Sequence, residues 1–163
     1  MKKYYEKVNL PTLPDKFITD IDTMTADGNI CPTGNIKPSG DSIFAVYEVN
    51  QEIYDIYQPL FDKEISIRWQ IITADLPIHY DWGTGSDKYL YLIDRGGDDV
   101  VTKFYTDYEK DDRSGGSFEQ GERELTFEVK EIEKSWFRLN VKQPHQVVNI
   151  TRPRIALILR PRK

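Results

Sequence analysis

EISIRWQI, residues 64–71, is the stretch that decides the fold class of this chain. Its large apolar side chains fall at every second position: Ile65, Ile67, Trp69 and Ile71. A period of two is typical of a β-strand with one face buried, because successive side chains of a strand point to opposite sides. The sequence therefore predicts a strand here.

More strand patterns follow this stretch as far as the C-terminal region. Short runs rich in strand-forming residues occupy 89–93, 100–105, 125–129, 136–141 and 155–159. Turn signals rich in glycine, serine and aspartate separate several of them, at 83–86, 96–99 and 114–117. Several short strands divided by such turns are typical of a β-sandwich or barrel.

The region before residue 64 has a different pattern. In residues 50–61 the apolar side chains follow the spacing of an amphipathic helix, with Asn50 as the N-cap and Pro59 able to end the helix early. A second short helix is predicted at 15–21. We expect one domain, 1–163, that is mainly β with N-terminal helices (α+β): a helical and loop support region at 1–63 and a β core at 64–163.

Composition excludes some classes of protein. The chain has 163 residues, 39% hydrophobic and 30% charged, which suits one soluble globular domain. A formal net charge of -5 argues against nonspecific binding of nucleic acid. Cys31 is the single cysteine, and no apolar run approaches the roughly 20 residues of a membrane span. We therefore expect a cytoplasmic protein with no membrane partner.

The two histidines of the chain occur in a pattern that is typical of metal ligands. His79 and Asp81 are two residues apart, so on a strand their side chains share a face. His145 lies far downstream, and Arg154 follows it nine residues later. Two imidazoles and a carboxylate form the facial triad of non-haem Fe(II) enzymes, although zinc also accepts this set. The residues predict a metal site and leave the metal open.

These residues and their surroundings resemble the 2-oxoglutarate- and Fe(II)-dependent oxygenases, in particular the prolyl-hydroxylase-like and phage- or marine-type members. The resemblance covers roughly residues 65–160. It is carried by these segments: PIHYDW at 77–82, YLYLID at 89–94, GG at 96–97, VTKFY at 101–105, LN at 139–140, PHQV at 144–147 and RPRIAL at 152–157. It implies that residues 64–163 form a double-stranded β-helix, the jelly-roll or cupin-like barrel.

The resemblance also implies roles for individual residues. His79, Asp81 and His145 would be the catalytic metal ligands and would hold Fe(II). Arg154 would bind the distal carboxylate of 2-oxoglutarate through a bidentate guanidinium pair, with Arg152 as the reserve candidate. Family members often carry Ser or Thr two residues after this arginine. That position is Ala156 here, so the resemblance leaves Tyr89 or Tyr91 to supply a hydroxyl to the co-substrate.

The expected function is a dioxygenase that uses dioxygen and 2-oxoglutarate to hydroxylate a C–H bond. Its substrate would be peptidyl, of the prolyl type, or a small molecule. Two alternatives stay open at this point: a cupin-like metal-binding enzyme that does not use 2-oxoglutarate, and a non-catalytic β-sandwich that serves binding or structure. The sequence gives no oligomeric state.

Overall fold

The structure, a computed structural model, describes residues 4–19, 44–81, 85–106, 116–118 and 123–162. Cys31 and parts of the predicted turns at 83–86 and 114–117 lie outside these residues. The described chain is mainly β, as predicted, with two antiparallel sheets and few helices.

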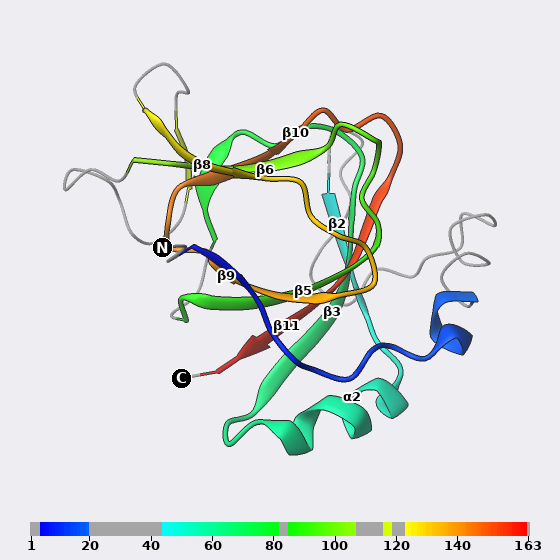
Figure 1. Cartoon of the computed structure of the whole chain (residues 1–163). Helices are drawn as coiled ribbons and strands as arrows, with labels where there is room; N and C mark the ends of the chain where they lie inside the picture. Colours follow the sequence, from blue (N-terminus) through cyan, green and yellow to red (C-terminus); the bar gives the residue numbers. More distant parts are fainter. Residues whose placement is uncertain (1–3, 20–43, 82–84, 107–115, 119–122, 163) are drawn as a thin grey trace.

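The two sheets face each other, as Figure 1 shows. The larger has six strands in the order β1 (Tyr5–Lys7), β9 (Trp136–Asn140), β5 (Asp87–Asp94), β11 (Arg154–Pro161), β3 (Ile65–Ile72) and β2 (Phe44–Glu48). The smaller has five in the order β7 (Gly116–Phe118), β4 (Ile78–Tyr80), β10 (His145–Val148), β6 (Val101–Tyr105) and β8 (Leu125–Val129).

All six strands predicted from the sequence are present, as β3, β5, β6, β8, β9 and β11. The sequence patterns missed β1, β2, β4, β7 and β10. Four of them, β1, β4, β7 and β10, have only three or four residues, which is too short to establish a period. As β1 and β2 form the two edges of the larger sheet, the region at 1–63 contributes strands as well as helices.

Strand β11 lies inside the larger sheet and pairs along its length with β3 and β5. Its odd-numbered side chains, from Ile155 to Leu159, pack in the apolar layer on one face of the sheet. Ala156 and Ile158 pack on the other face, toward the smaller sheet. Both faces of β11 are buried, so its sequence is almost continuously apolar rather than alternating.

The outer face of the larger sheet is covered by helical segments. Helix α2 (Gln51–Tyr57) begins at Asn50, whose side chain accepts the N–H of Glu52, and continues into the 3₁₀ helix η1 (Gln58–Leu60), which contains Pro59. Residues 15–19 are also helical. No helix within the described ranges is both long and apolar enough to cross a membrane.

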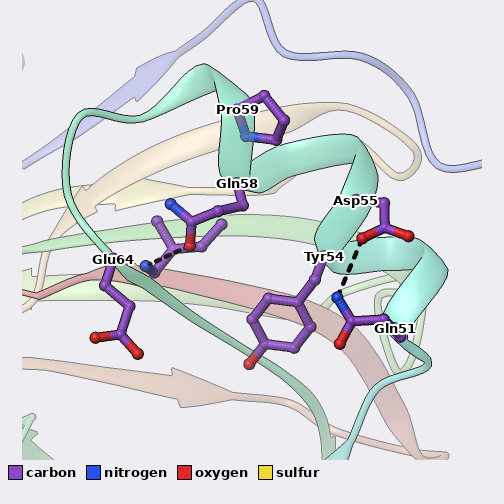
Figure 2. Close-up of a pocket in the computed structure, with 7 residues that line it drawn as sticks. Gln51, Tyr54, Asp55, Gln58, Pro59 and Glu64 are labelled. Carbon is purple, nitrogen blue, oxygen red and sulfur yellow. Dashed lines mark hydrogen bonds between the residues drawn. The ribbon is translucent and has the colours of Figure 1, made fainter.

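Helix α2 and the 3₁₀ helix also close part of an open strand edge (Figure 2). Strand β2 pairs with β3 only from residue 68 onward, which leaves the backbone at 65–67 without a neighbouring strand on that side. There the side-chain oxygen of Gln58 accepts the Ile65 N–H at 3.0 Å, and the Tyr54 hydroxyl accepts the Ile67 N–H at 3.1 Å. These two side chains therefore replace ladder hydrogen bonds and fix the helix on the sheet.

The centre of β11 is predicted to dominate stability. Leu157 is fully buried at 0% exposure, so Leu157→Ala should lower the free energy of unfolding by about 2–5 kcal/mol. Leu125 is 49% exposed, and Leu125→Ala is the matched control, with an expected change within about 0.5 kcal/mol. Urea unfolding followed by circular dichroism measures both. Equal losses in the two variants would contradict this description of the core.

Candidate metal centre

Two short strands of the smaller sheet bring the histidines together. Strands β4 and β10 are antiparallel neighbours, and His145 stands directly opposite His79 in their register. The two imidazole rings are 4.4 Å apart between centroids. Asp81 follows β4 by one residue, and its N–H donates to the carbonyl of Val141 at 3.0 Å. The i, i+2 spacing brings His79 and Asp81 together, and the pairing of β4 with β10 adds His145.

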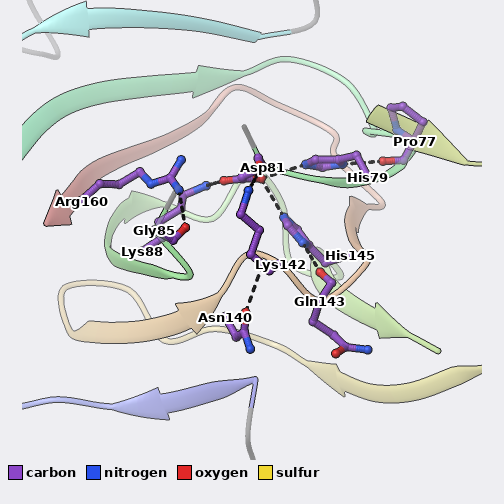
Figure 3. A network of polar contacts seen from close by, with 10 residues as sticks. All are labelled: Pro77, His79, Asp81, Gly85, Lys88, Asn140, Lys142, Gln143, His145 and Arg160. Atoms are coloured by element: carbon purple, nitrogen blue, oxygen red, sulfur yellow. Dashed lines mark hydrogen bonds and ion pairs between the residues drawn. The ribbon is translucent and has the colours of Figure 1, made fainter. Parts of the chain in front are cut away.

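The three side chains converge on a single carboxylate oxygen (Figure 3). Asp81 Oδ1 lies 3.3 Å from His79 Nε2 and 3.1 Å from His145 Nε2. One ligand atom from each residue lies within 4.8 Å of the others. Two ligands at right angles on bonds of about 2.1 Å are about 3 Å apart, so the two distances from Asp81 Oδ1 to the histidines suit one shared metal ion.

Backbone carbonyls orient both imidazoles. Nδ1 of His79 is 2.7 Å from the carbonyl oxygen of Pro77, and Nδ1 of His145 is 2.8 Å from that of Gln143. A carbonyl can only accept, so each Nδ1 carries the proton and donates it. Each Nε2 then keeps a lone pair directed at the third ligand. This outer hydrogen bond is the usual means by which proteins fix a metal-binding histidine.

Electrostatics favour the protonation states that bind metal. Burial raises the pKa of the Asp81 carboxyl, but the positive charge of Lys88 and the contacts with both histidines outweigh burial and hold this pKa well below its usual range. Burial lowers the pKa of His145, and the opposing attraction of Asp81 does not restore it. At neutral pH the site therefore offers an ionised carboxylate and a neutral imidazole at His145, as metal binding requires.

Two lysines hold Asp81 from different sides. Lys88, from β5, donates to Asp81 Oδ2 at 3.2 Å, and its side chain is only 12% exposed. Lys142 donates to the backbone carbonyl of Asp81 at 2.7 Å. Because Lys88 engages Oδ2, the other oxygen, Oδ1, is the one that faces both histidines. The carboxylate is therefore oriented to bind a metal through a single oxygen.

The three residues open into a small cavity of about 50 Å³ between the sheets. Most of its wall is apolar, and the polar side chains besides the three candidate ligands come from strands of both sheets. Its lining residues are Gln70, Ile72, Leu76, His79, Asp81, Lys88, Leu90, Thr102, Leu139, His145, Val147 and Arg154. A mostly apolar wall with a few convergent polar groups is typical of small-molecule sites.

Arg154 lines this cavity but is already paired. Its guanidinium donates to a carboxylate oxygen of Glu131, whose other oxygen accepts the hydroxyl of Thr102. Arg154 also donates to the backbone carbonyl of Arg95 at 3.3 Å. The side chains of Arg154 and Glu131 are 4% and 0% exposed. The positive charge predicted to hold a co-substrate is thus neutralised by a buried carboxylate of the chain itself.

Gly96 allows the strand of Arg154 to approach this closely. Gly96 has a φ of 94°, and a Cβ there would lie 2.8 Å from the Cβ of Arg154. The Gly96 carbonyl accepts the N–H groups of both Thr151 and Arg152. Arg152, the reserve candidate, is exposed at the surface and donates to Asp94 at 3.0 Å. It is not among the residues that line the cavity.

The tyrosines proposed to reach the co-substrate lie on the opposite side of the sheet, which corrects that expectation. Tyr91 packs against Trp136 at 5.3 Å between ring centroids, and Tyr89 packs against Phe61 at 5.4 Å. Both belong to the outer apolar layer. The physical reason is the strand period: in β5 the even-numbered side chains face the cavity, so Lys88 and Leu90 occupy it instead.

Sequence reasoning missed four polar residues of the cavity region, Gln70, Lys88, Thr102 and Glu131. Lys88 directly precedes the apolar run predicted at 89–93 and shares the period-two face of Leu90, a signal that was present in the sequence. Thr102 stands within the predicted strand at 100–105. Glu131 reaches Arg154 from a non-strand segment after β8, and no local pattern marks it among its charged neighbours.

Comparison with known proteins gives only distant likenesses. No protein-family model and no curated protein matches the sequence. Among solved structures, vicilin from Corylus avellana (hazelnut) is 12% identical over 86% of this chain and 35% of its own, with a TM-score of 0.45. Vicilin from Solanum melongena is 8% identical over 77% and 30%, with a TM-score of 0.42. An oxalate decarboxylase is 13% identical over 85% and 34%, with a TM-score of 0.41. The chain spans about a third of the length of these structures, and similarity this low carries no argument about function.

The buried His145 is predicted to make stability depend on pH. The pKa of His145 is lower in the folded protein than in the unfolded chain, because burial disfavours its charged form. Its contribution to the free energy of unfolding is therefore fully present above the ordinary pKa of 6.5 and is lost as the pH falls below that value. Urea titrations should show a falling free energy of unfolding from about pH 7 to about pH 5, with a smaller slope in His145→Gln. Leu125→Ala should keep the wild-type slope. An unchanged slope in His145→Gln would refute this assignment.

Proposed function

We propose that this chain is a cupin-type metal-binding protein whose centre holds one divalent ion through His79, Asp81 and His145. The observation that carries the proposal is the convergence of three ligand atoms within 4.8 Å, with each imidazole fixed by a backbone carbonyl. The ligand atoms would be Nε2 of both histidines and Oδ1 of the carboxylate. This donor set is typical of mononuclear Fe(II) sites and is also open to zinc.

The strand order supports a finer assignment of the fold as a jelly roll, or double-stranded β-helix. From β3 to β6 and again from β8 to β11, consecutive strands alternate between the larger and the smaller sheet. Such alternation winds the chain around two facing sheets, as in a jelly roll. Residues 64–163 would then be the barrel core of a single domain, extended at both edges of its larger sheet by the strands at 5–7 and 44–48.

A bound ion would supply Lewis-acid or redox chemistry, because three protein ligands leave coordination positions open for a substrate. The residues of the chain would do the rest. Lys88 orients the carboxylate. The apolar side chains of the cavity wall, among them Ile72 and Val147, would exclude water from the reacting groups. These features suit an enzyme rather than a purely structural module.

The pairing of Arg154 favours an enzyme that does not anchor 2-oxoglutarate at this residue. A co-substrate carboxylate would have to displace Glu131, which would then be left charged and without its cationic partner in a buried position. Removing one partner of a buried ion pair typically costs about 3–5 kcal/mol. The family resemblance does not account for the ion pair between Arg154 and Glu131, because it assigns the guanidinium of Arg154 to an external ligand.

A 2-oxoglutarate-dependent dioxygenase is the second candidate. The observation in its favour is that Arg154 lines the same cavity as the three candidate ligands, on a strand of the facing sheet. This function would use dioxygen and hydroxylate a peptidyl or small-molecule substrate. It would require Glu131 to rearrange when the co-substrate binds, so the two candidates differ in what Arg154 contacts.

The proposed centre can be tested directly by metal binding. Anaerobic calorimetry with Fe²⁺ or Co²⁺ should give one ion per chain, because the three donors form one site. His145→Ala should weaken binding by at least about tenfold through the loss of one ligand. Asp98→Asn, a change at an exposed residue away from the cavity, is the control and should bind like wild type. Equal binding by His145→Ala and wild type would exclude the proposed centre.

The second candidate has a test of its own. If 2-oxoglutarate chelates the ion, its anaerobic addition to the Fe²⁺ protein should produce a visible charge-transfer band. The affinity should then fall in Arg154→Ala and persist in Arg152→Ala, because only Arg154 faces the cavity. The main proposal predicts no dependence on Arg154 of this kind. Metal binding without any band would eliminate the second candidate and leave the metal centre in place.

A further inference from the structure

Lys88 has hydrogen-bonding capacity that the described structure does not use. An ammonium group carries three N–H donors. One of them meets Asp81 Oδ2 at 3.2 Å, and within the described parts of the chain Nζ has no second partner. The side chain is 12% exposed and lines the cavity beside the three candidate metal ligands. Two donors therefore have no partner among the described residues, on a side chain that lines the cavity next to the proposed ion.

The charges around the cavity indicate what those donors would meet. Asp81 and Lys88 balance each other, and Glu131 balances Arg154. A histidine that binds a metal is neutral, so these four charged groups leave the protein part of the loaded site close to neutral. A divalent ion would add two positive charges to a space that is mostly apolar. Buried charge is costly without a partner, so the loaded site would favour a ligand of negative charge.

Of the two cations that line the cavity, only Lys88 is available for such a ligand. The guanidinium of Arg154 is held by Glu131 and by the carbonyl of Arg95. Lys142 points at the backbone carbonyl of Asp81 and does not line the cavity. Lys88 can keep its contact with Asp81 Oδ2 while its other donors turn to a ligand on the ion.

We propose that Lys88 forms an anion subsite of the metal centre, where a small anion binds the ion directly and accepts hydrogen bonds from the Lys88 ammonium. This inference rests on the metal centre proposed above. It assigns to Lys88 the anion recognition that the family resemblance assigns to Arg154. The volume of about 50 Å³ restricts the ligand to a small anion, since a bulky one would have to displace the wall.

The test uses the Co²⁺-loaded full chain, with azide as the anionic probe and imidazole as the neutral probe, both followed by the visible Co²⁺ spectrum. Lys88→Met should weaken azide binding by about tenfold or more, the effect of losing a charge-assisted hydrogen bond. Imidazole binding should not change. Because Lys88 also orients Asp81, the Co²⁺ affinity of each variant is measured first, and azide binding is compared with Co²⁺ at saturation. Lys88→Arg should recover part of the azide affinity.

Lys142→Met is the matched control. It removes a second lysine that also contacts Asp81, but one that lies outside the cavity wall, so azide binding should stay at the wild-type level. Equal azide affinity in Lys88→Met and wild type would overturn the subsite. So would a parallel loss of azide and imidazole, which would make Lys88 a residue that only positions Asp81. Failure of the wild type to take up Co²⁺ would overturn the metal centre, and the subsite with it.

Discussion

The structure depends on the burial of both faces of the six-stranded sheet. Strand β11 lies within this sheet, and its side chains pack alternately into an outer apolar layer under the helical segments and an inner one between the sheets. Neither layer could form alone, because each uses every second residue of the same strands. The helices of the N-terminal region and the smaller sheet are therefore both needed to remove this sheet from water.

The candidate site lies where the inner layer changes from apolar to polar side chains. Its three ligand groups are held in place by contacts that exist without an ion: two carbonyls on the imidazoles and a lysine on the carboxylate. Such pre-organisation lowers the cost of ordering ligands when a metal binds. The lysine contact also pairs the partly buried charge of the Asp81 carboxylate.

Sequence patterns predicted the parts of this site that depend on local periodicity. His79 and Asp81 share a side because they are two residues apart, and the strand predicted at 155–159 begins directly after Arg154. The face of Tyr89 and Tyr91 could not be predicted, since a strand buried on both sides has no polar face to mark its orientation. The contact of Glu131 with Arg154 joins residues 23 positions apart through the fold, and no local pattern encodes it.

The alternation of side chains along β11 also determines the effect of a shift in its register. A shift of its pairing by one residue would exchange the side chains of the two layers. The guanidinium of Arg154 would then enter the outer apolar layer beneath the helices, and Leu157 would face the cavity. Insertion or deletion of a single residue within 154–161 would have the same effect. A change of length by one residue in this strand is therefore expected to disturb both layers at once.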